Sequence, residues 1–145
     1  MYPKLVKEIR SKTGELHFKR WQLLSTPWLS LYIHYITKAD EDTHSHNHPW
    51  SLRTLILSGG YLVRTEKPTN DIISKSIIVY KYKSWFSYTY IDRSEYHKVI
   101  NVDEPTWTLA LVGKKYDDWG YLVGGTHVGH VEYRKYKHEV RDKKD

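Results

Sequence analysis

The 145-residue chain contains no cysteine. This absence excludes disulfide bonds, thiolate metal ligands and a cysteine nucleophile, and it agrees with a location inside the cell, where thiols stay reduced. The sequence also lacks an apolar run long enough to span a membrane. Its first residues, Met1-Tyr-Pro-Lys-Leu-Val-Lys-Glu8, lack the apolar stretch of a signal peptide. We therefore expect a cytoplasmic protein with no membrane partner.

Charge of one sign is not concentrated anywhere in the chain. The formal net charge is +6, from 23 basic and 17 acidic residues, and the basic C-terminal segment 131–145 also contains Glu132, Glu139 and Asp142. Such mixing is typical of a solvated surface, so we expect no nucleic-acid partner. The glycine-rich run 124–130 lacks the lysine and the spacing of a phosphate-binding loop.

Aromatic residues are abundant, with 13 tyrosines and 6 tryptophans. Aromatic side chains favour strands, although they also stack on bases in proteins that bind single-stranded nucleic acids. In a strand-rich chain of this size we expect them to pack in the sheet and the core.

Segments rich in β-branched and aromatic residues alternate with turn-forming residues. We expect strands at 28–37, 77–82, 87–91, 96–100 and 106–112, and a hairpin over 52–65 that turns at Ser58-Gly59-Gly60. Turns are expected at 92–95, 101–105 and Gly124-Gly125, and a short helix, interrupted at Gly14, near the N-terminus. This pattern predicts one all-β domain over 1–145, a β-sandwich or small antiparallel barrel with little helix.

The most informative run is His44-Ser-His46-Asn-His48-Pro49-Trp50. Its imidazoles occupy alternate positions, which share one face of a strand, and Pro49 favours extended backbone at His48. A His-x-His pair on a strand can bind a transition metal. His44 and His48 would lie about 13 Å apart in a regular strand, so the trio cannot share one ion. A further ligand must come from elsewhere in the chain.

Two neighbouring positions have supporting roles in this interpretation. Asp42 extends the alternation, so its carboxylate is placed to orient an imidazole without binding the metal itself. His44 is expected beside the ligands or at the rim of the site. His34, between Ile33 and Tyr35, is expected to be a core histidine satisfied by a hydrogen bond. Histidine clusters also occur in polar loops that bind no metal, and this alternative stays open here.

Two stretches resemble the first motif of the cupin superfamily, namely His46-Asn-His48-Pro-Trp50 and the following Thr54-Leu-Ile-Leu-Ser-Gly-Gly-Tyr61. They are most similar to small phage and bacterial cupins. Segments 23–32, 105–109 and 119–120 resemble the same group, so the resemblance covers about residues 20–123. It implies a small antiparallel barrel of the double-stranded β-helix or jelly-roll type with a ligand-binding mouth.

The resemblance also implies a metal site. Cupins use two histidines of the first motif, matched by His46 and His48, and one of a second motif, matched by His97. Thiol-dioxygenase cupins use three histidines with iron, so the implied cofactor is a divalent transition metal, either Fe, Mn, Ni or Zn.

The chain departs from the cupin pattern at both motifs. The glutamate that usually follows the first motif is missing, because that region reads Leu52-Arg53. Asp92 and Ser94 replace the proline and glycine of the second motif. Arg53 is placed to bind an anionic substrate group in a bidentate way.

Three functions follow as alternatives. The first is a metal-dependent enzyme acting on a small molecule, such as a non-haem oxygenase. The second is a metal-free cupin of the sugar-epimerase or isomerase kind, in which a histidine is the base, Tyr61 or Tyr96 the acid, and Arg53 the anion ligand. The third is a non-catalytic module for a small ligand or nucleic acid. Pairing of barrel edges between two chains would give a homodimer.

Overall fold

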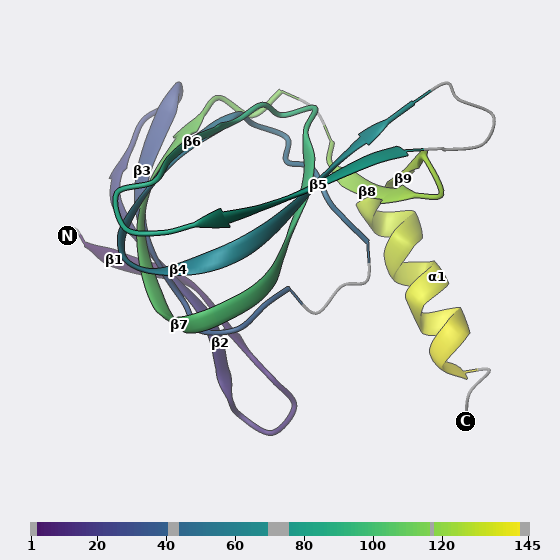
Figure 1. Ribbon diagram of the computed structural model, residues 1–145, viewed down its shortest axis with the longest axis horizontal. Helices are drawn as coiled ribbons and strands as arrows, with labels where there is room; N and C mark the ends of the chain where they lie inside the picture. The colour runs from purple at the N-terminus through teal and green to yellow at the C-terminus, as the bar shows by residue number, and fades with distance from the viewer. Residues whose placement is uncertain (1–2, 41–43, 70–75, 117, 143–145) are drawn as a thin grey trace.

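The computed structural model describes residues 3–40, 44–69, 76–116 and 118–142. Its main body is a seven-stranded antiparallel sheet in the order β1-β2-β3-β7-β4-β5, with β6 also paired to β4. The strands are β1 (Lys4–Arg10), β2 (Leu16–Ser25), β3 (Leu29–Ile36), β4 (Leu52–Pro68), β5 (Ser76–Lys83), β6 (Tyr88–Ile91) and β7 (Tyr96–Gly113). The strands of the sheet curl round on themselves (Figure 1). The small antiparallel barrel predicted from the sequence is thus confirmed.

Two long strands, β4 and β7, form the most extensive pairing in the barrel. The predicted hairpin over 52–65 is wrong, because β4 runs straight through the glycine pair as one strand. Gly59, with a φ of +87°, instead lies in a bulge where the register with β7 shifts. The positive φ that suggested a turn serves a kink within the strand. The turn predicted at 101–105 is likewise wrong, since β7 continues through it.

The inner face of the barrel follows the period of two expected of strands. On β7 the side chains of Thr106, Thr108, Ala110 and Val112 are buried, and they alternate with more exposed neighbours. Their cross-strand partners on β4, among them Ile56, are also buried. Residues of β3 that pair with these buried positions of β7 face the inside of the barrel as well. The residues of β2 that pair with those of β3 also face inward.

The N-terminal region is a hairpin and not the predicted helix. Strands β1 and β2 pair antiparallel, and their connection contains Gly14 at a φ of +88°. Leu5 and Ile9, which lie within the segment predicted to be helical, are exposed on β1. Backbone pairing to β2 thus overrides the weak local preference of this segment.

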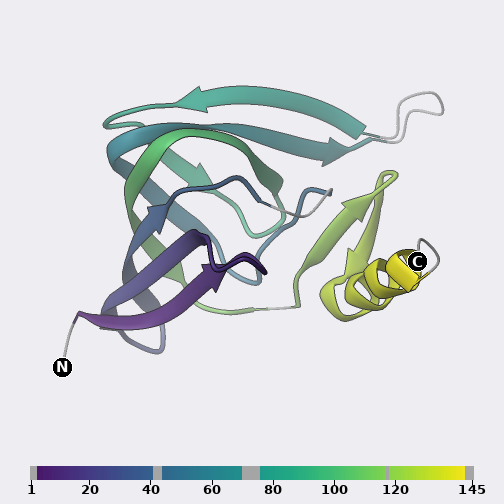
Figure 2. The same ribbon diagram turned by 90° about the horizontal axis from the view of Figure 1, so that it is seen from below.

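The C-terminal part adds a second, smaller unit beside the barrel (Figure 2). Strands β8 (Gly120–Val123) and β9 (Thr126–Gly129) pair across the predicted turn at Gly124 and Gly125, and the helix α1 (His130–Asp142) follows. The segment expected to be a solvated tail is thus largely helical. Its Tyr133 is 4% exposed and stacks on Tyr121 of β8 at a centroid distance of 3.7 Å. Within the described residues, no helix is long and apolar enough to cross a membrane.

The bulge in β4 gives a test of stability. A Cβ added at Gly59 would lie 2.6 Å from the Pro105 carbonyl oxygen and 2.6 Å from Thr106 Oγ1. We therefore expect Gly59→Ala to lower the free energy of unfolding by about 3 kcal/mol or more, from the clash and the positive φ together. Gly14→Ala has a similar φ but no atom within 4 Å of the new Cβ, so it should cost only about 1 kcal/mol. Urea unfolding of both variants measures the difference, and equal losses would contradict this account.

Candidate metal centre and its cavity

The histidine run is not the regular strand that was predicted. Only His46 forms ladder pairs, as an isolated bridge to His97 on β7 and to Tyr121 on β8. The amide of Gly120 donates to Asn47 Oδ1 at 2.8 Å, which takes the place of a ladder bond. Pro49 has no N–H with which to continue a ladder. The run is thus a short extended segment between β7 and β8.

Backbone hydrogen bonds position this segment closely. The His46 amide donates to the His97 carbonyl at 2.9 Å, and the His97 amide donates to the His46 carbonyl at 2.8 Å. On the other side, the Asn47 amide donates to the Gly120 carbonyl at 3.0 Å and the Leu122 amide to the Ser45 carbonyl at 2.9 Å. Since both neighbours are strands, the side-chain directions of the segment are set by their pleat.

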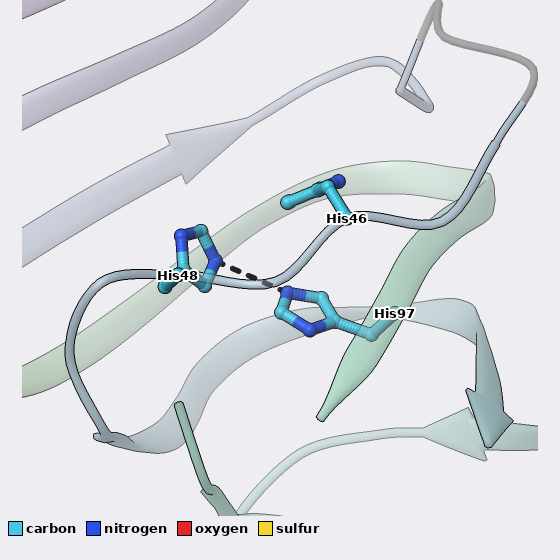
Figure 3. Close-up of side chains that lie close together, drawn as sticks. All are labelled: His46, His48 and His97. Carbon is cyan, nitrogen blue, oxygen red and sulfur yellow. Dashed lines mark hydrogen bonds between the residues drawn. The ribbon is translucent and has the colours of Figure 1, made fainter. Parts of the chain in front are cut away.

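Three imidazoles from these two segments approach one another (Figure 3). One ring nitrogen each from His46, His48 and His97 lies within 4.8 Å of the others. The Nε2 atoms of His48 and His97 are 3.2 Å apart. The structure therefore brings together the three residues singled out as metal ligands from the sequence, two from the run and one from a distant strand.

The geometry of this triad fits a small divalent cation. Metal–nitrogen bonds of about 2.1 Å place ligand nitrogens roughly 3.0–3.4 Å apart. The 3.2 Å between His48 and His97 already has this value, and the ring nitrogen of His46 lies within 4.8 Å of both, so its ring would have to move closer to share an ion. Among the described residues no carboxylate joins the group. An ion held here would have three imidazole ligands, leaving its other positions for water or substrate.

Burial keeps two of these imidazoles in the form that binds metals. Burial, and then the charge of His46, lower the pKa of His97 to about 3, although Asp40 and the backbone of Glu95 act to raise it. Burial, with the neighbouring His97 and His46, also holds the pKa of His48 well below its usual value. Both rings are therefore neutral at pH 7, and neutral imidazole is the metal ligand.

The triad lines a cavity of about 400 Å³ within the barrel. Aliphatic side chains such as Ile36 and Val112 form much of its wall, together with inward-facing residues of β2, β3, β4 and β7. Four cationic side chains also line it, and they are Lys7, Arg20, Lys38 and Lys137. Of the described lining residues, Asp40 alone has a carboxylate, and its Oδ2 accepts a hydrogen bond from the Val99 amide at 2.8 Å. The cavity combines neutral ligands with a surplus of positive charge.

The three candidate catalytic residues, Tyr61, Tyr96 and Arg53, lie in different environments. Tyr61 is 8% exposed and lines the cavity, and burial raises the pKa of its hydroxyl although a hydrogen bond with Thr54 lowers it. Tyr96 bonds His127 through its hydroxyl, at 2.7 Å from Nδ1, and is not among the described lining residues. Tyr61 is therefore the tyrosine that a bound molecule would meet.

Arg53 does not have the position expected of an anion ligand. Its side chain is exposed on the outer face of β4, and its guanidinium lies 5.5 Å from the ring centroid of Tyr90. Leu52 and Thr54, the inward neighbours, line the cavity instead. The prediction that Arg53 meets a substrate must be corrected, because alternation along the strand turns this residue outward.

The remaining histidine predictions have mixed outcomes. His44 Nδ1 lies 3.0 Å from the hydroxyl of Tyr133, so it connects the run to α1, and its expected place beside the ligands is corrected. Asp42 lies outside the described residues. His34 is buried and accepts a hydrogen bond at Nε2 from Arg20 Nε at 2.9 Å, which confirms the expectation of a satisfied core histidine.

Sequence reasoning missed the inward cation Arg20 and the buried Thr108. Strand β2 mixes polar and apolar residues on both of its faces, so no alternation indicates that Arg20 points inward. On β7, small and large residues alternate over 106–110, and the small ones are buried. This alternation of small and large residues is the one sequence pattern that could have indicated an inward-facing residue here, and it applies to Thr108 and not to Arg20.

No family model and no curated protein matches the sequence. The similarities to known proteins are therefore similarities of structure. A cupin-2 domain protein from Rhodospirillum rubrum matches with a TM-score of 0.59 at 13% identity, over 85% of this chain and 78% of that chain. KdgF from Halomonas sp. matches with a TM-score of 0.54 at 13% identity, over 77% of this chain and 89% of that chain.

A third match is Fe(II)-HppE with an alternative substrate, with a TM-score of 0.54 at 11% identity, over 77% of this chain and 57% of that chain. The chain spans about a third of the length of several other matched chains. Similarity at these identities shows the fold alone.

The buried His34 makes stability depend on pH. Burial, and then the charges of Arg20 and Lys7, lower its pKa from 6.5 to about 3. Between these values the unfolded chain binds a proton that the folded chain does not, so stability falls as the pH decreases from about 6.5 towards 3. From pH 7 to pH 5 we expect the wild-type chain to lose about 2 kcal/mol more than His34→Gln, which cannot titrate. Urea unfolding at both pH values tests this, and identical pH dependences would contradict it.

Proposed function

Because this chain has the cupin fold that its sequence resemblance predicted, we propose that it is an enzyme that acts on a small molecule. The proposed enzyme depends on a divalent transition metal that His46, His48 and His97 bind. One observation carries the proposal, namely that three imidazoles from two separate segments converge at the wall of the barrel cavity, and that the rings of His48 and His97 are neutral at pH 7. The burial that lowers the pKa values of His48 and His97 would be costly for charged rings and suits metal ligands.

The donor set narrows the choice of metal. Imidazole ligands suit iron, nickel and zinc, whereas manganese prefers sites rich in oxygen ligands, which the triad lacks. The similar structure with Fe(II) favours iron among these, and we propose a non-haem oxygenase as the leading activity. When bound, such a metal supplies Lewis acidity or activates dioxygen.

The protein itself would orient the substrate and limit access of water. The aliphatic part of the cavity wall would limit the access of water to the triad, and this would strengthen electrostatic interactions within the cavity. The hydroxyl of Tyr61 is protonated at neutral pH, and burial raises its pKa further, so it would donate a proton and not accept one. Asp40, fixed by the Val99 amide, would offset part of the positive charge at the cavity wall.

A metal-free isomerase-like enzyme is the second candidate. It is favoured by the presence of Tyr61 and neutral His48 on one cavity, since an acid and a base are both available there. In this case the 3.2 Å contact between His48 and His97 would be a hydrogen bond between two neutral rings. Homodimer formation and a cytoplasmic location stay predictions under either function.

Metal titration separates the two candidates. We expect the chelator-treated wild-type protein to bind one equivalent of Fe(II), added anaerobically, or of Zn(II). His97→Ala and the double variant His46→Ala/His48→Ala should bind more than roughly 100-fold more weakly, because even residues that only support a ligand contribute about 10–100-fold. Isothermal titration calorimetry and elemental analysis provide the measurements.

The control for this titration is His44→Ala, which removes an imidazole of the same run that is not one of the three proposed ligands and that bonds Tyr133. Its affinity should equal that of the wild type. If the wild-type protein binds neither metal after reconstitution, the metal-dependent function is refuted and the acid–base alternative is favoured.

A further inference from the structure

A row of polar side chains crosses the inner face of the barrel. Arg20 on β2 lies directly opposite His34 on β3, and His34 lies directly opposite Thr108 on β7. All three residues line the cavity that contains the histidine triad. Directly opposed residues on one face of an antiparallel sheet have Cβ atoms about 4.5–5.5 Å apart, so the row is continuous.

Arg20 is a half-buried cation with no neutralising partner among the described residues. Its Nε donates to His34 Nε2 at 2.9 Å, and its guanidinium carbon lies 5.5 Å from the ring centroid of Phe18 and 5.0 Å from that of Tyr32. These neighbours hold the plane of the guanidinium but carry no negative charge. In the part of the chain that the structure describes, Arg20 has no ion-pair partner. Its terminal N–H groups are thus available to a ligand.

Lys7 of β1 adds a second positive charge to the same cavity. In the register of β1 with β2, Lys7 lies directly opposite Arg20, so the two cations are neighbours. Burial and the charge of Arg20 lower the pKa of Lys7, while Asp40 raises it. Two neighbouring cations that line one cavity are stabilised when an anion binds between them.

Thr108 adds a polar group to the same wall. The residue is 1% exposed, and its Oγ1 has no hydrogen-bond partner among the described residues. Buried hydroxyl groups almost always have a partner, so this hydroxyl is suited to bond a water molecule or a ligand in the cavity. A threonine hydroxyl donates readily to an oxygen atom of an anion.

We propose that Lys7, Arg20 and Thr108 form a binding site for an oxyanion, the carboxylate or phosphate group of a small acid whose reacting end lies at the triad. The identity of this acid as the substrate rests on the proposed function, whereas binding of the anion does not. The guanidinium fork suits the geometry of carboxylate and phosphate alike. The arginine expected from the sequence to do this, Arg53, lies on the outer face, and Arg20 takes its place.

Anion titration of the metal-free protein tests the site. Inorganic phosphate and malonate are added separately at low ionic strength, and binding is followed by isothermal titration calorimetry. We expect one equivalent of at least one anion to bind, and the tighter of the two identifies a phosphorylated or a carboxylic substrate. Arg20→Met, which keeps the packing on Phe18 and Tyr32, should weaken binding about 10-fold or more, as expected for loss of a charge-assisted hydrogen bond.

The matched control is Arg53→Met, which removes the same charge from the outer face of β4. Its anion affinity should equal that of the wild type. If Arg20→Met and Arg53→Met bind equally well, or if the wild type binds neither anion, the site does not exist.

Thr108→Val gives a second test that does not depend on how well Arg20→Met folds. Valine fills the same volume without the unsatisfied hydroxyl, so this variant should be more stable than the wild type in thermal unfolding and yet bind the anion several-fold more weakly. A purely structural threonine would not change stability and affinity in opposite directions. Unchanged affinity would overturn the proposed role of Thr108.

The double variant His46→Ala/His48→Ala separates this inference from the proposed function. It should lose the metal and keep the anion. If the wild type binds the anion but no metal, the oxyanion site stands and the metal-dependent function fails. If the wild type binds metal but no anion, the metal-dependent function stands and the oxyanion site is refuted.

Discussion

A pair of reciprocal backbone hydrogen bonds between residues 46 and 97 is the contact on which the candidate site depends. These residues are distant in the sequence, and the two bonds fix their separation and the directions of their side chains. His48, two positions further along, then points to the same side as His46. The three rings meet because the backbone has already been aligned, so ordering them costs little additional conformational entropy.

The barrel was predictable because it depends on patterns that repeat along the chain. Residues that favour strands, separated by turn-forming residues, indicated most strands, including 28–37 and 106–112. Turn-forming residues were an insufficient guide where the same backbone conformation occurs in two different kinds of structure. The positive φ of Gly59 fits a hairpin turn and a bulge equally, and only pairing with a distant strand selects the bulge. Pairing to β2 likewise decided that Leu5 and Ile9 lie in a strand.

Within the site, the sequence indicated the histidines and not the charged wall opposite them. His46 and His48 are recognisable because two donors at alternate positions form a compact pattern, and resemblance to a motif suggested His97. Arg20 and Thr108 are brought together by registers across three strands, β2, β3 and β7. No short window of sequence contains such a relation. Arg53 was chosen for its closeness to the motif, and side-chain alternation places it outside.

The stack of Tyr133 on Tyr121 makes α1 part of the dielectric environment of the triad. Tyr121 lies against His46, with ring centroids 6.1 Å apart, and so an aromatic layer two rings deep separates this imidazole from the helix backbone. The apolar shell around a metal site controls its polarity and hence the reduction potential of a bound ion. Through this layer, a helix that contributes none of the three histidines would set how readily an iron at the triad changes its oxidation state.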